Sequence, residues 1–180
     1  LDIATRCFEV FYEKRPTQID AAPFTPLYFN WDKDSTGSYY TNSNIYLVGS
    51  AGGDTDEYDY NIVVHEWVHY FENNVSRSDS LGGSHGHGDI LDLRLSFGEG
   101  FATGLSGIIG SRHYVDTYSS YQAGLDNDIE NESESIPGWF SENSILKLVY
   151  DICDTTNATN IMGDNADIDN DGIDLDLGNI

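Results

Sequence analysis

The chain has 180 residues, of which 39% are hydrophobic, enough for one domain with a substantial core. Its 31 acidic and 8 basic residues give a formal net charge of −23, which disfavours binding to nucleic acid or to an anionic membrane surface. No apolar run approaches the ~20 residues of a membrane-spanning helix. The acidity favours a secreted, periplasmic or cell-surface protein, and the start at Leu1 indicates a removed leader segment or a fragment.

The first part of the chain is predicted to form a scaffold. Apolar residues at helical spacing predict a helix over residues 1–14 that ends near Pro16. Alternation over residues 27–31 predicts a half-buried strand, and residues 39–48 predict one or two more. The segment 45–49 directly precedes the next helix. It is either the edge strand of a substrate cleft or an ordinary inner strand.

The segment from Asn61 to Phe71 carries the motif H-E-x-x-H in a pattern typical of a buried helix. His65 and His69 are four positions apart and share one helical face, so both imidazoles can bind one divalent metal ion. Glu66 lies between them and can reach the water on that metal. The motif predicts a zinc hydrolase with Glu66 as its general base. Two ordinary core histidines are the alternative on the motif alone.

A second segment, residues 95–105, offers a third ligand. A tetrahedral catalytic zinc ion has three protein ligands and one open position. Glu99 is a lone acid among small and apolar residues, where an unpaired carboxylate is costly to bury. Glu99 is therefore the predicted third ligand. Glycines such as Gly98 and Gly100 remove side-chain bulk and are predicted to let this segment pack close against the motif helix.

At these residues the chain resembles the gluzincin metallopeptidases, and most closely their aminopeptidase group. That group pairs H-E-x-x-H with a later N-E-G-F-A-T, which residues 98–103 match at all but the first position. The resemblance covers about residues 55–108 and implies zinc-dependent hydrolysis of peptide bonds. The order of predicted elements agrees with an α+β, zincin-like metallopeptidase core, in which a small sheet covers an active-site helix and a glutamate helix follows.

The spacing between the motifs departs from the family pattern. His69 and Glu99 are separated by 29 residues, more than is usual, so the extra length must form a loop. That loop, residues 76–89, is polar and rich in glycine, and a solvated loop is favoured over extra metal ligands at His85 and His87. The G-x-M-E-N stretch that holds a free amine in aminopeptidases is missing. We therefore expect an endopeptidase that acts on peptides or proteins.

The family also uses a Tyr or His downstream of the glutamate ligand to stabilise the oxyanion. Tyr114 and Tyr150 are the candidates, and Tyr150 is preferred because its distance along the sequence is closer to that in the family. Residues 111–137 show no pattern that predicts an element. A final core-packing helix is predicted to follow Ser141, which can cap it.

The C-terminal stretch contains D-x-D-x-D-G. Asp167, Asp169 and Asp171 alternate ahead of a glycine and resemble the first half of a calcium loop. The bidentate acid of an EF-hand is absent, and an acidic, solvated terminus is the alternative. The predicted organisation is a catalytic domain over residues 1–160 and an acidic tail over residues 161–180 with a candidate Ca²⁺ site.

Two further questions stay open at the level of sequence. Cys7 and Cys153 lie near opposite ends on predicted helices, and they are either disulfide-bonded or both buried as thiols. The rival function is a catalytically inactive, calcium-dependent surface or adhesion module on the same fold. A zinc hydrolase that cleaves another type of bond is the third hypothesis.

Overall fold

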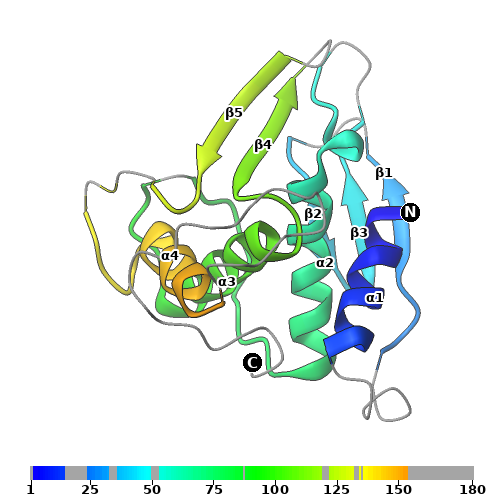
Figure 1. Cartoon of the computed structure of the whole chain (residues 1–180), viewed down its shortest axis with the longest axis horizontal. Helices are drawn as coiled ribbons and strands as arrows, with labels where there is room; N and C mark the ends of the chain where they lie inside the picture. Colours follow the sequence, from blue (N-terminus) through cyan, green and yellow to red (C-terminus); the bar gives the residue numbers. More distant parts are fainter. Residues whose placement is uncertain are drawn as a thin grey trace.

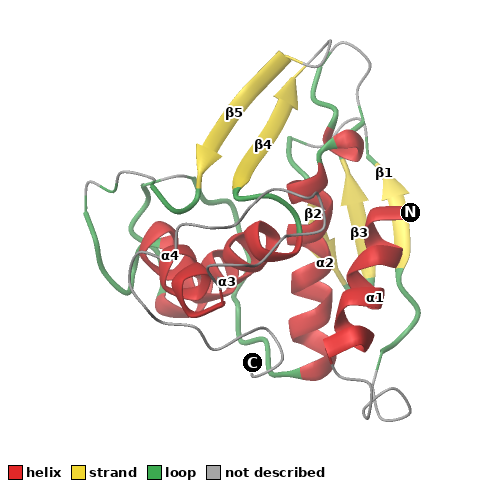
Figure 2. Cartoon of the chain, viewed as in Figure 1, coloured by secondary structure: helices red, strands yellow, loops and turns green. Residues whose placement is uncertain are grey.

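The computed structural model of the chain shows a mixed α+β fold, as predicted (Figures 1 and 2). The structure describes residues 2–14, 24–32, 36–49, 53–86, 88–118, 122–131, 134 and 136–153. The acidic tail with Asp167, Asp169 and Asp171 lies outside these residues, as does His87. The calcium site and the boundary after residue 160 therefore stay predictions.

Three short strands form one sheet in the order β1-β3-β2. The strands are β1 (Tyr28–Trp31), β2 (Tyr39–Thr41) and β3 (Asn44–Leu47); β3 pairs in parallel with β1 and antiparallel with β2. Asn42 and Ser43 join β2 to β3 with φ angles of 48° and 62°, as a two-residue hairpin turn requires. The inner-strand alternative for residues 45–49 is confirmed, and β2 forms the edge in its place.

Helix α2 (Tyr60–Val75) contains the H-E-x-x-H motif and lies at the centre of the molecule. The sheet and α1 (Asp2–Lys14) contact it on one side and α3 on the other (Figure 1). Its buried residues lie around most of its circumference and include Val64, Trp67, Val68 and Tyr70. The prediction of a buried motif helix is confirmed, because apolar neighbours on several sides require apolar side chains on several faces.

Helix α3 (Leu93–Ile109) is helical despite four internal glycines, each of which is unfavourable by about 1 kcal/mol relative to alanine. Its most extensive described contact is with α4 (Glu142–Cys153). A Cβ atom at Gly100 would lie 2.6 Å from Ile145 Cβ, and one at Gly104 would lie 2.8 Å from the Leu146 carbonyl oxygen. Helix α3 does contact the motif helix, as predicted, but Gly100 and Gly104 admit α4 and are not what brings α3 to α2.

A hairpin that the sequence did not predict follows α3. Its strands are β4 (His113–Tyr118) and β5 (Gln122–Asp128), which pair antiparallel. The Asp59 carboxylate, directly before α2, accepts hydrogen bonds from the Thr117 amide and hydroxyl, both at 2.6 Å. These bonds attach β4 to the start of the motif helix.

Both cysteines are buried thiols in the main core, where Cys7 is fully buried and Cys153 is 3% exposed. The buried alternative for the two cysteines is confirmed. Burial raises the pKa of the Cys7 thiol to about 12. Among the helices in the described residues, none combines the length and the apolar character needed to cross a membrane.

Candidate metal centre

Helix α2 directs His65 and His69 toward α3. Their rings meet edge to face with centroids 4.7 Å apart, and their Nε2 atoms are 3.0 Å apart. The two side chains are only 10% and 15% exposed. The spacing of one helical turn therefore brings two imidazole nitrogens to one buried point, as the motif predicted.

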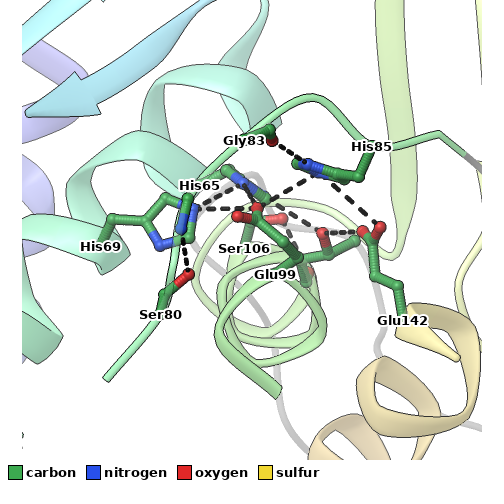
Figure 3. A network of polar contacts seen from close by, with 10 residues as sticks. His65, His69, Ser80, Gly83, His85, Glu99, Ser106 and Glu142 are labelled. Carbon is green, nitrogen blue, oxygen red and sulfur yellow. Dashed lines mark hydrogen bonds and ion pairs between the residues drawn. The ribbon is translucent and has the colours of Figure 1, made fainter. Parts of the chain in front are cut away.

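Glu99 reaches the same point from α3. Its Oε2 atom lies 3.2 Å from His65 Nε2 and 3.1 Å from His69 Nε2 (Figure 3). Metal bonds of about 2.0–2.1 Å at tetrahedral angles place the ligand atoms of a zinc ion about 3.3–3.4 Å apart. The three predicted ligands form a triangle close to that size, although the loop between them is longer than in the family they resemble.

The donor set of this triangle also fits a cation. Two N–H groups cannot point at each other across 3.0 Å, so at least one of the two facing Nε2 atoms carries a lone pair. That lone pair also faces the Glu99 oxygen, which is itself an acceptor. A single metal ion resolves this conflict because all three atoms become its ligands. The residues present therefore fit zinc.

The pKa values of Glu99 and His69 also describe this site. Burial would raise the pKa of Glu99, but the facing imidazoles of His65 and His69 hold it far below its ordinary value. Burial would lower the pKa of His69, but Glu99 and then Glu66 raise it to about 9. The site therefore keeps an ionised carboxylate in a buried position.

Glu66 lines a cavity of about 880 Å³ together with the three candidate ligands. It is 6% exposed, and burial raises the pKa of its carboxyl group, which the nearby His65 and His69 offset only in part. A general base near its operating pH can both accept and return a proton. Its position and its raised pKa agree with the role that the motif predicted.

The structure brings Tyr114, and not Tyr150, to this cavity. Tyr114 lies on β4, and its ring centroid is 6.4 Å from that of His65. Burial raises the pKa of Tyr114 well above its ordinary value, so its hydroxyl stays protonated and can donate a hydrogen bond. Tyr150 is 1% exposed and does not line the cavity; it packs behind Ile129 and Leu146, which do line it, in a separate small core.

The loop after α2 folds back over the ligands. His85 Nε2 lies 3.4 Å from Glu99 Oε2 and 3.9 Å from Glu142 Oε2, and its side chain is 26% exposed (Figure 3). Gly82 and Gly83 adopt φ angles of 60° and 120°, which favour glycine and turn the chain back toward α3. Residues 81–84 and Gly86 around it are exposed, as expected, and His85 is the residue of this loop that lies against Glu99.

Sequence reasoning missed two residues beside the ligands. Thr103 lies one turn after Glu99 on α3, and its hydroxyl is 3.1 Å from His65 Nδ1. Glu142, the first residue of α4, accepts a hydrogen bond from that hydroxyl at 3.1 Å. The i, i+4 spacing from Glu99 is a signal that could have indicated Thr103. No local pattern indicates Glu142, because its position depends on the packing of α4.

A second compact group lines another part of the same cavity. Asp54, Asp56 and Asp116 each place a carboxylate oxygen within 4.8 Å of the other two, and Asp56 lies in the 3₁₀ turn η2 (Asp56–Tyr58). Burial raises the pKa of Asp56 to about 8, despite a hydrogen bond from Ser38, and Asp54 and Asp116 add to the rise. This group therefore holds a proton at neutral pH.

Comparisons with known proteins add no relative to this picture. The chain matches no protein-family model, no curated protein and no solved structure. The function of the cavity therefore has to be inferred from the geometry and chemistry of its own residues.

Proposed function

We propose that the chain is a zinc-dependent metallopeptidase with a zincin-like core that hydrolyses peptide bonds as an endopeptidase. One observation carries the proposal. His65, His69 and Glu99 form a buried triangle with sides of 3.0–3.2 Å, and Glu66 faces the same cavity. The two histidines and the base come from the H-E-x-x-H motif, and Glu99 joins them from α3.

Each residue has a distinct part in the proposed chemistry. His65, His69 and Glu99 hold the zinc ion, which when bound supplies a Lewis acid that acidifies water and polarises a carbonyl group. Glu66 takes the proton from the attacking water and delivers it to the leaving amine. The Tyr114 hydroxyl donates a hydrogen bond to the oxyanion that develops on the substrate.

The walls of the cavity suit an extended peptide. The edge strand β2 lines it together with the turn residue Asn42, and the loop segment that contains His85 also contributes to its lining. An extended substrate can add to such an edge as a further strand. Asp54, Asp56 and Asp116 also line the cavity and can hold a free amine, so peptides with blocked and unblocked amino termini must be compared.

The decisive experiment replaces Glu66 by Gln. The variant should keep about one zinc ion per chain, because Glu66 is outside the ligand triangle, and it should lose ~10²–10⁴-fold of its peptide cleavage, because glutamine accepts no proton. Zinc content is measured by elemental analysis after dialysis, and cleavage by release of fragments from blocked peptides.

His65→Ala is the matched variant, which should lose both zinc and cleavage. If Glu66→Gln lost its zinc, the ligand set would be wrong. If it cleaved blocked peptides as fast as the native chain, Glu66 would not be the base. Faster cleavage of unblocked than of blocked peptides by the native chain would replace the endopeptidase by an aminopeptidase. Native protein that retains no zinc would reject the proposal.

A further inference from the structure

The ring of His65 is held at both nitrogens. Its Nε2 atom faces the other two ligands, and its Nδ1 atom lies 3.1 Å from Thr103 Oγ1. The Thr103 hydroxyl in turn donates to Glu142 Oε1 at 3.1 Å. His65 and Thr103 are each 8% exposed, so water competes little for these bonds. A continuous network of polar contacts thus runs from α4 through α3 to a ligand on α2.

The donors and acceptors in this network show which ring nitrogen of His65 carries a hydrogen. A carboxylate accepts hydrogen bonds only, and a threonine hydroxyl has one proton to donate. Because Thr103 gives that proton to Glu142, it must accept the bond from His65, whose Nδ1 therefore carries a hydrogen. With Nδ1 as the donor to Thr103, Nε2 is the ring nitrogen left to bind a metal ion through its lone pair, and it faces Glu99 and His69.

We infer that Thr103 and Glu142 are positioning residues that hold His65 in the tautomer and orientation required of a metal ligand. The inference rests on the metal site of the proposed function and adds a third helix to it. A ligand histidine commonly donates its second N–H to a carboxylate or carbonyl group, which fixes the ring and raises its basicity. Here the carboxylate acts through a hydroxyl.

The glycines of α3 make this connection possible. A Cβ atom at Gly100 would lie 2.7 Å from the carbonyl oxygen of Glu142 and 2.6 Å from Ile145 Cβ. Gly100 lies one position after Glu99, so the contact that admits α4 is adjacent to the ligand. The same approach of two helices brings the Glu142 side chain within reach of Thr103.

The test compares Thr103→Val with Thr103→Ser. Valine has nearly the shape of threonine but accepts no hydrogen bond, so zinc affinity, measured by competition with a chelator, should fall ~10–100-fold. Serine restores the hydroxyl and should recover most of that loss. Nitrogen NMR of the metal-free protein should show hydrogen on Nδ1 of His65 in the native chain and in Thr103→Ser, and a mixture of tautomers in Thr103→Val.

Ser106→Ala is the control, since Ser106 is a fully buried hydroxyl on the same helix that donates to the Thr103 carbonyl and not to His65. It should leave zinc affinity and the His65 tautomer unchanged. Native zinc affinity in Thr103→Val, or no recovery in Thr103→Ser, would overturn the inference. If the native chain bound no zinc, the proposed function would fail, and a His65 ring with hydrogen on Nε2 and none on Nδ1 in the metal-free protein would separately refute the positioning role.

A second pair of variants tests the role of helix packing. Gly100→Ala should separate α4 from α3 and weaken zinc binding in the same way as Thr103→Val. Gly98→Ala is its match, because a Cβ atom there would lie 3.4 Å from Ser80 Cβ, an ordinary contact. Equal zinc affinity in the two alanine variants would show that Glu142 does not act through its approach to α3.

Discussion

Two groups of acidic and imidazole side chains face one cavity, and they differ in how they are built. His65, His69 and Glu99 come from two long helices that are packed together, and they combine imidazoles with a carboxylate. Asp54, Asp56 and Asp116 come from a loop, a 3₁₀ turn and a strand, and all three are acids.

The difference in composition determines the direction in which the pKa values of each group shift. In the helical group unlike partners stabilise one another, so the pKa of Glu99 is lowered and that of His69 rises to about 9. In the acidic group burial and like charges raise the pKa of Asp56 to about 8. Two equally compact groups can therefore differ in their chemistry. The first suits a transition metal with nitrogen ligands, and the second retains a proton.

The largest expected effect separates the two groups by zinc affinity. Glu99→Ala or His69→Ala removes a ligand and should weaken zinc binding beyond the ~10–100-fold that loss of an outer partner causes. Asp116→Ala removes a carboxylate from the same cavity and should change zinc affinity little. The measurement is chelator competition at constant pH. If Asp116→Ala lost as much zinc affinity as Glu99→Ala or His69→Ala, the two groups would not differ in metal binding.

The second effect concerns stability and pH. The folded chain keeps the Asp56 proton up to about pH 8, whereas the unfolded chain releases it near the ordinary value of 3.8, so the free energy of unfolding should fall as pH rises between these values. Asp56→Asn should remove much of this fall. The expected change is on the order of 1–2 kcal/mol and not larger, because solvent screens part of the carboxylate. The measurement is the free energy of unfolding by urea of the metal-free protein, native and Asp56→Asn, at pH 5 and pH 8.5.

Asp126→Asn provides the control for that measurement. Asp126 is an acid on β5 whose side chain is 55% exposed, and it pairs with the exposed His113. Its replacement should leave the slope of stability against pH nearly unchanged between pH 5 and pH 8.5. An Asp56→Asn slope equal to the native slope would show that Asp56 is ionised in the folded chain.

The smallest expected effect tests whether His85 belongs to the ligand set of the helical group. His85 lies 3.4 Å from Glu99 Oε2 but is not a member of the group whose ligand atoms all lie within 4.8 Å of one another. His85→Ala should therefore change zinc affinity less than about tenfold, below the usual effect of losing an outer partner. A loss as large as that in His69→Ala would instead add His85 to the ligand set.

The parts of the site that the sequence predicts are those that depend on local periodicity. His65, Glu66 and His69 need only the 3.6-residue repeat of one helix. Glu99 is predicted from its chemistry, as an acid that an apolar segment can bury only with a partner. The mixed α+β class follows from the order of strands and helices, which the structure confirms.

The rest depends on tertiary packing. Strands β4 and β5 are rich in polar residues and lack a clear alternation, so no pattern indicated the hairpin that carries Tyr114 to the cavity. Glu142 is placed by the approach of α4 to the glycines of α3. His85 is placed by a loop whose path depends on two glycines with positive φ angles. Each of these positions needs the fold to be known first.

The loop between the ligands has a consequence for the stability of the fold. His69 and Glu99 are separated by 29 residues, and the two cysteines of the chain form no disulfide. A metal ion held by both residues would join the two ends of this loop in the folded chain only. A ligand that binds the folded chain and not the unfolded chain stabilises the fold by its binding free energy. A chelator would then act on the folding equilibrium as well as on the chemistry.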